Sequence, residues 1–141
     1  MGAISDIVAA IETRLTTLGY KATDEVFNFD AVPNSIIDKA YRIETRLVKN
    51  EYHLNNEANP NEEISVYIAY KAKRNTRTVW KTAMSDRETI EKDVINAAAI
   101  RALASDPLVT MNGEATTTKY LGDYLISRLV FMVDYLRDIT P

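Results

Sequence analysis

The sequence contains no cysteine, which removes disulfides, thiolate metal sites and cysteine nucleophiles from consideration at once. It has one histidine, His53, so a Ser-His-Asp triad or a common type of metal site would have to be built around that ring. Its four glycines, Gly2, Gly19, Gly113 and Gly122, are scattered and form no phosphate-binding motif. We therefore expect a protein that is not an enzyme and that holds no metal and no cofactor.

Long apolar runs and an excess of positive charge are also missing. No apolar run approaches the roughly 20 residues that span a bilayer, and the N-terminus lacks the basic start and apolar core of a secretory signal. The net charge of -3 is unlike that of a dedicated nucleic-acid binder, which usually carries a strong basic excess. At 141 residues, with 46% hydrophobic and 26% charged residues, the chain has the composition of one soluble globular domain.

Two segments alternate between apolar and polar residues, which is the pattern of a half-buried strand. They are Tyr41-Arg-Ile-Glu-Thr-Arg-Leu-Val48 and Ile64-Ser-Val-Tyr-Ile-Ala-Tyr-Lys71. Successive residues of a strand point to opposite faces, so apolar side chains gather on one face and Arg42, Glu44 and Arg46 on the other. The sequence predicts strands over 41–49 and 64–73.

Helical spacing marks two other segments. Apolar residues recur at three- and four-residue steps over residues 4–18, and Gly19 supplies a natural end for a helix there. Ser85-Asp-Arg-Glu88 has the form of a capping box, in which the two outer side chains satisfy backbone donors at a helix start. A second helix is therefore predicted over 86–104.

The stretch between the two strands is polar. It contains Asn55-Asn-Glu-Ala-Asn-Pro-Asn61, a cluster of turn-forming residues with almost no apolar anchor. We expect a mobile polar loop at about 50–63, longer than the usual hairpin connection.

The last long segment, residues 120–136, is rich in β-branched and aromatic residues. This composition favours a long final strand, although Leu125, Leu129, Met132 and Leu136 also fit a helical stripe. The predicted fold is a single α+β domain over residues 1–141, with a mainly antiparallel sheet covered on one face by two helices.

Several residues are candidates for an interface. The row Arg42, Glu44 and Arg46 would either contact other subunits or form an ordinary solvated sheet face. Tyr67 falls on the face opposite the apolar residues of its strand, and we expect it to be exposed, since outward tyrosines suit an interface. Tyr52 and Glu57, in and beside the predicted loop, are further candidates.

The one basic concentration is Lys71-Ala-Lys-Arg-Asn-Thr-Arg77, just before Trp80. Its charged members, Lys71, Lys73, Arg74 and Arg77, would contact single-stranded nucleic acid, a charged protein surface or solvent alone. Trp80 itself is interpreted as a core or strand-to-helix anchor. This segment would be the contact surface if the protein is a small binding module for nucleic acid or for a regulatory protein partner.

The predicted order is helix (4–18), strand (41–49), polar loop, strand (64–73), capped helix (86–104) and final strand. In this order the chain resembles the tail terminator (tail-completion) proteins of long-tailed bacteriophages, and it also resembles other tail-completion and head-to-tail connector proteins. Members of the tail terminator family are small α+β subunits that close into a hexameric ring at the head-proximal end of the tail tube, stop its polymerisation and receive the head. The resemblance implies a structural virion protein, assembled in the host cytoplasm and located in the tail. The implied partners are further copies of the chain, the tail tube protein and a head-completion or connector protein, with no membrane and only incidental nucleic-acid contact through the ring lumen.

Overall fold

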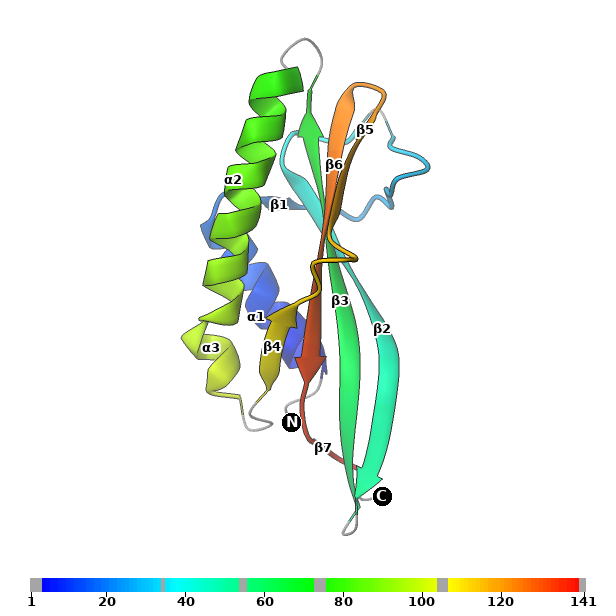
Figure 1. Cartoon of the computed structure of the whole chain (residues 1–141), viewed down its shortest axis with the longest axis vertical. Coiled ribbons are helices and arrows are strands. Elements are labelled where there is room, and N and C mark those ends of the chain that lie inside the picture. The colour runs from blue at the N-terminus through cyan, green and yellow to red at the C-terminus, as the bar shows by residue number, and fades with distance from the viewer. Residues whose placement is uncertain (1–3, 34, 54–55, 73–75, 104–106, 140–141) are drawn as a thin grey trace.

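The chain folds around one sheet, with helices packed on one face and an irregular segment on the other (Figure 1). The computed structural model describes residues 4–33, 35–53, 56–72, 76–103 and 107–139. Its helices are α1 (Ile4–Thr17), α2 (Thr76–Ile95) and α3 (Ala98–Arg101). Its strands are β1 (Lys21–Ala22), β2 (Ala40–His53), β3 (Glu57–Lys71), β4 (Leu108–Met111), β5 (Thr117–Leu121), β6 (Tyr124–Asp134) and β7 (Arg137–Asp138).

The strands lie in the order β1-β2-β3-β6-β4, with β5 also paired to β6 and β7 to β3. Every pairing is antiparallel except the short parallel contact between β1 and β2. The predicted fold class, an α+β domain with a mainly antiparallel sheet covered on one face by two helices, is confirmed.

The main core lies between the sheet and the helices α1 and α2. From α1 it takes Ile7, Ile11 and Leu15, all 0% exposed, which follow the predicted helical stripe. The helix ends as expected, because Gly19 adopts the left-handed φ of +96° that a side chain would disfavour. The sheet contributes the apolar residues of three neighbouring strands: Tyr41, Ile64, Val66, Ile68, Leu125, Leu129, Phe131 and Val133.

An ion pair ties the two long helices together. Arg14 of α1 donates from Nε and Nη2 to the two carboxylate oxygens of Asp93 on α2, each at 2.7 Å. The hydrogen bonds from Arg14 hold the pKa of the Asp93 carboxyl below its ordinary value. This two-point contact fixes the helices relative to one another as well as to the sheet.

A second, smaller core covers part of the opposite face. Residues 23–33 and 35–39 form the irregular segment that lies over this face in Figure 1. Tyr124 donates from its hydroxyl to the carbonyl of Ile36 at 2.7 Å, and Arg42 donates from Nε to the carbonyl of Phe27. The apolar residues that meet beneath the segment are Phe27, Ile36, Ala40, Tyr67, Ala69, Tyr124 and Ile126.

The prediction of a mobile loop at about 50–63 is wrong, because most of that stretch is paired strand. β2 and β3 form one long hairpin, with a register that runs from Ala40 opposite Ala69 to His53 opposite Glu57. The pairing satisfies backbone groups whatever the side chains are, so polar residues on both faces are tolerated. We call the far end of this hairpin, residues 47–53 and 57–62, the arm. It reaches beyond the helices at the lower end of the molecule (Figure 1).

Two boundaries also differ from the prediction. The prediction that a helix starts at a capping box at Ser85 is wrong, because α2 begins nine residues earlier, at Thr76. Ser85 is an interior helix residue, and its carbonyl accepts a hydrogen bond from Thr89 Oγ1. The helix then stops at Ile95, and α3 follows as a separate turn. The final segment is strand, as predicted, but it divides into β5 and β6 at a turn in which Gly122 has a φ of +59°.

Candidate functional site

The predicted charged row lies on the sheet face opposite the helices. Across the strands, Arg42 is opposite Tyr67, which is opposite Arg128, while Arg46 is opposite Glu63. Arg42 has little freedom: its side chain is 10% exposed, its guanidinium lies 4.3 Å from the Tyr67 ring centre, and Nη1 pairs with Glu44 at 2.7 Å. We conclude that Arg42 mainly fastens the irregular segment to the sheet.

Further along this face, charged side chains line a shallow hollow of about 430 Å³. Glu63 is its centre: one carboxylate oxygen accepts from Arg128 at 3.1 Å and the other from Arg46 at 3.0 Å. Arg128 also donates to Ser65 Oγ at 3.1 Å. The Arg46 side chain is 67% exposed and the Glu63 side chain 11%, so Arg46 is the group that could exchange its partner for a carboxylate or phosphate from another molecule. The hollow is lined by Glu44, Thr45, Arg46, Glu63, Ser65 and Arg128.

The prediction that Tyr67 is exposed is wrong. Alternation places it on the correct face, but the irregular segment covers it, and only 8% of the residue is exposed. Its ring lies edge-on to Phe27 and Phe29 and between the guanidinium groups of Arg42 and Arg128. Tyr67 is therefore a core residue of the second cluster.

The arm carries exposed apolar side chains. Tyr52 is 70% exposed, Leu47 is 51% exposed and Val48 is 46% exposed. A shift in the β2–β3 register lies between Leu47 and Lys49, at Val48. In the described chain, β1 reaches only the first two residues of β2, and nothing pairs with the outer edge of β2 beyond Tyr41. Glu57, a predicted candidate, is exposed at the end of the arm, opposite His53 and beside β7.

Opposite Leu47 on the neighbouring strand β3 is a buried acid, Glu62, which is 9% exposed. Burial raises the pKa of the Glu62 carboxyl, and a hydrogen bond from Tyr135 and the charge of Arg137 only partly offset the effect. The free energy of unfolding therefore loses a contribution as pH rises through the folded-state pKa of this group, because the unfolded chain releases the proton more readily.

We expect Glu62→Gln, which cannot titrate, to gain stability relative to the parent protein between pH 4 and pH 7, on the order of 1 kcal/mol. Urea unfolding of both proteins across this pH range measures the difference. A difference that stays constant with pH would show that folding does not shift the pKa of Glu62, and a falling difference would show that the folded arm favours the charged carboxylate. Either result would contradict the prediction.

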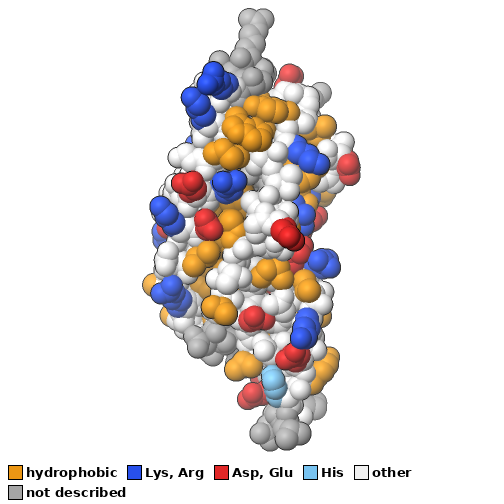
Figure 2. Space-filling view, viewed as in Figure 1, with side chains coloured by type: hydrophobic (Ala, Val, Ile, Leu, Met, Phe, Trp, Pro, Cys, Tyr) orange, Lys and Arg blue, Asp and Glu red, His pale blue; other side chains and the backbone are white. Residues whose placement is uncertain are grey.

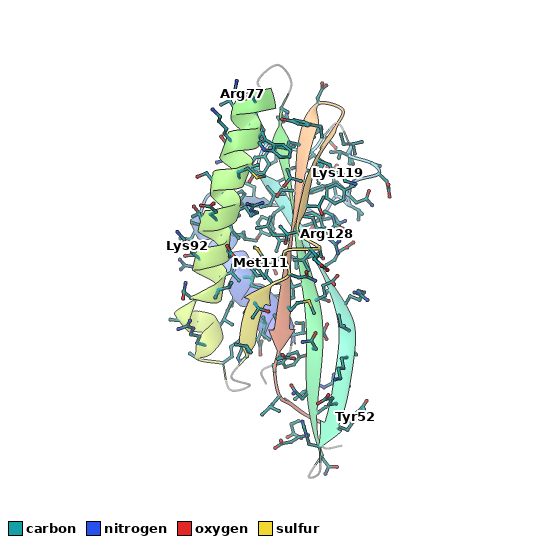
Figure 3. All side chains as sticks on the ribbon, in the orientation of Figure 1. Tyr52, Arg77, Lys92, Met111, Lys119 and Arg128 are labelled. Carbon is teal, nitrogen blue, oxygen red and sulfur yellow. The ribbon has the colours of Figure 1, made fainter. Side chains whose placement is uncertain are left out.

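The predicted basic segment is only partly described. Lys71 is exposed at the end of β3, and Arg77 is exposed in the first turn of α2, while Lys73 and Arg74 lie outside the described residues. Trp80 is not a core residue, because it is 38% exposed. The alternative, a strand-to-helix anchor, agrees with its position, since Trp80 on α2 stacks on Tyr120 of β5 with ring centres 5.7 Å apart. Tyr52 and Arg77 lie at opposite ends of the molecule (Figure 3).

A buried hydrogen-bonded chain joins β3, α2 and the connection between α1 and β1. The Tyr20 and Tyr70 hydroxyls lie 3.4 Å apart, and Tyr70 donates to Asp86 Oδ2 at 3.1 Å. Burial raises the pKa of both tyrosines. Because Tyr20 and Tyr70 are at most 4% exposed, this chain connects α2 to the sheet rather than facing a substrate.

The described residues contain neither a metal-binding cluster of acidic, histidine or cysteine side chains nor a membrane-spanning helix. No group of three or more His, Cys, Asp or Glu side chains within those ranges could hold a metal ion. None of the described helices is both long and apolar enough to cross a membrane. His53 is exposed near the arm tip.

Three features of the candidate surfaces were not predicted from the sequence. Glu63 and Arg128 lie near Arg46 because of the pairing of β2, β3 and β6. The sequence analysis assigned residue 63 to a loop and therefore did not predict this cluster. Tyr120 is 40 positions from Trp80, and no local pattern joins them. The sequence identifies Leu47 as an apolar residue of an alternating strand, which predicts a buried side chain. The structure shows that it is 51% exposed.

Comparison with models of known protein families finds no match to this sequence, and comparison with curated proteins finds none.

Proposed function

We propose that the protein is a structural assembly subunit that self-associates into a closed ring, and that the ring terminates the tail tube of a long-tailed bacteriophage and docks to the head. The observation that carries this proposal is the arm. It extends past the helical layer, and no strand of the described chain pairs with the outer edge of β2 beyond Tyr41. Its side chains Leu47, Val48 and Tyr52 are exposed.

An arm of this kind suits a contact with a second copy. Open strand edges pair with other strands unless something blocks them, and exposed apolar side chains on a projecting element gain free energy when a neighbour covers them. A head-to-tail contact repeated by identical subunits closes into a ring when its rotation closes. The tail location, the tube protein and the head-completion partner rest on the resemblance alone.

The polar hollow gives the ring a second surface. Arg46 is exposed on the face that lacks helices, and Glu44 and Glu63 supply opposite charge beside it. A surface with both signs can pair with a neighbour or line a hydrated lumen, and its individual ion pairs contribute little to stability.

The purified protein should form closed rings. Size exclusion coupled to light scattering is expected to give a mass about six times the 15.9 kDa monomer, by the resemblance and ring closure, and negative-stain images should show a central hole. Monomers at every protein and salt concentration would contradict the proposal.

A further inference from the structure

We infer that the end of the molecule opposite the arm is a docking surface for an extended acidic segment of a partner protein, which adds as a strand to the outer edge of β5 and covers Trp80 and Tyr120. This surface is separate from the arm and does not depend on ring formation.

The first observation is an exposed aromatic pair. Trp80 on α2 is 38% exposed, Tyr120 on β5 is 45% exposed, and their rings stack at an interplanar angle of 30°. Figure 2 shows hydrophobic side chains gathered at this upper part of the surface. Tryptophan and tyrosine that remain on the surface in contact with each other are the residue types that most often dominate a protein interface.

The second observation is a strand edge beside the pair. β5 pairs with β6 along residues 117–121, and no other strand of the described chain pairs with β5. The side of β5 away from β6 is therefore the side on which an added peptide strand would lie. An added strand would place alternate side chains on the same sheet face as Tyr120, next to Trp80.

The third observation is charge. Arg77 and Lys81 are three residues before and one residue after Trp80 on the exposed side of α2. Lys119 is exposed on β5 but lies on the sheet face opposite Tyr120, with Nζ 5.4 Å from the Phe29 ring centre. Figure 2 shows basic side chains beside the hydrophobic patch, and Figure 3 places Arg77 at this end of the molecule. Positive charge around an apolar centre favours an acidic partner and speeds its association.

These observations favour a peptide over the other occupants. A nucleic acid could stack on the aromatic rings but could not complete the hydrogen-bonded ladder of β5. A second copy could offer its strand β2, but that strand carries three basic residues and only two glutamates. It would therefore bring a net positive charge to a surface that is already basic. An acidic extended peptide with an apolar side chain satisfies the edge, the rings and the charge together.

A designed peptide tests the inference. The probe is a fluorescein-labelled peptide of about ten residues that alternates glutamate with valine and has one central phenylalanine. Trp80 is the only tryptophan, so its emission reports contact directly. We expect a shift to shorter wavelength, together with slower hydrogen exchange of the amides of residues 117–121.

Matched variants locate the contact by fluorescence anisotropy of the labelled peptide. Trp80→Ala and Tyr120→Ala should each weaken binding about tenfold or more, and Lys81→Glu should weaken it at low salt. Tyr52→Ala removes a more exposed ring, 70% against 38% and 45%, at the other end of the molecule and should leave the affinity unchanged. A peptide with proline at two alternate positions, which removes ladder donors and keeps the charge, should bind about tenfold more weakly.

Several outcomes would overturn the inference. They are no binding at about 1 mM peptide, equal binding of the proline peptide or of a lysine-for-glutamate peptide, and tighter binding of an oligothymidylate probe than of the acidic peptide. An unchanged affinity in both aromatic variants would overturn it as well. Ring formation measured in the same samples tests the proposed function separately, because the arm takes no part in this contact.

Discussion

The double substitution Leu47→Lys and Tyr52→Lys is expected to abolish self-association while leaving the subunit folded. Both side chains are more than half exposed, at 51% and 70%, so their replacement should change the free energy of unfolding by no more than about 0.5 kcal/mol. In a subunit contact each would act as an apolar anchor worth roughly 2 kcal/mol, so the pair weakens each contact by about a thousandfold. Sedimentation velocity of the variant should show monomers at concentrations where the parent protein is assembled.

The matched control for this variant is Val26→Lys. Val26 is 69% exposed in the irregular segment, so the change replaces an exposed apolar side chain by lysine away from the arm, and it adds one positive charge where the arm variant adds two. It should leave assembly intact. If the arm variant assembles like the parent protein, or if Val26→Lys prevents assembly equally well, the arm is not the contact.

Tyr67→Ala is expected to destabilise the folded subunit by about 3–5 kcal/mol, the usual range for removing a buried aromatic side chain. The ring is 8% exposed and lies between two guanidinium groups and two phenylalanines. Its loss would leave a cavity and would also remove the aromatic face against which Arg42 packs. Urea unfolding, with the slope compared between variants, measures the effect.

Tyr67→Phe is the control, because it keeps the ring and should destabilise by less than about 1 kcal/mol. A Tyr67→Ala protein within about 1 kcal/mol of the parent protein would mean that the second core contributes little. In that case the irregular segment would be held by its hydrogen bonds to Arg42 and Tyr124 instead.

Elements fixed by local chemistry were predictable from the sequence. The α1 stripe and the stop at Gly19 need only helical spacing and one left-handed residue, and the observed helix ends one residue from the predicted boundary. The long strands follow from alternation, and β-branched content correctly decided between strand and helix for residues 124–134.

Features that depend on distant neighbours were not predictable. The polar stretch around Pro60 has the composition of a loop, yet pairing with β2 makes it a strand, and the Pro60 carbonyl accepts a hydrogen bond from Tyr135. Ser85 and Glu88 match a helix-start motif, but residues 76–84 already continue the helix, so no unpaired backbone donors are left to cap.

The candidate surfaces show the same division. Alternation gives the face of Arg46 and of Tyr67, but only the fold shows that the irregular segment buries Tyr67 and leaves Arg46 exposed. The exposure of Leu47 and the stacking of Trp80 on Tyr120 depend on which elements reach each end of the sheet. That arrangement is a property of the whole chain.

Hydrogen exchange along β2, measured at low and high protein concentration, tests most directly whether subunits associate through the arm. We expect amides of residues 47–53 to become more protected as the mass of the assembly rises, while those of residues 64–69 of β3, which pair with both β2 and β6, stay unchanged. A rise in mass with no added protection in residues 47–53 would contradict it, and so would a mass that never rises above that of the monomer.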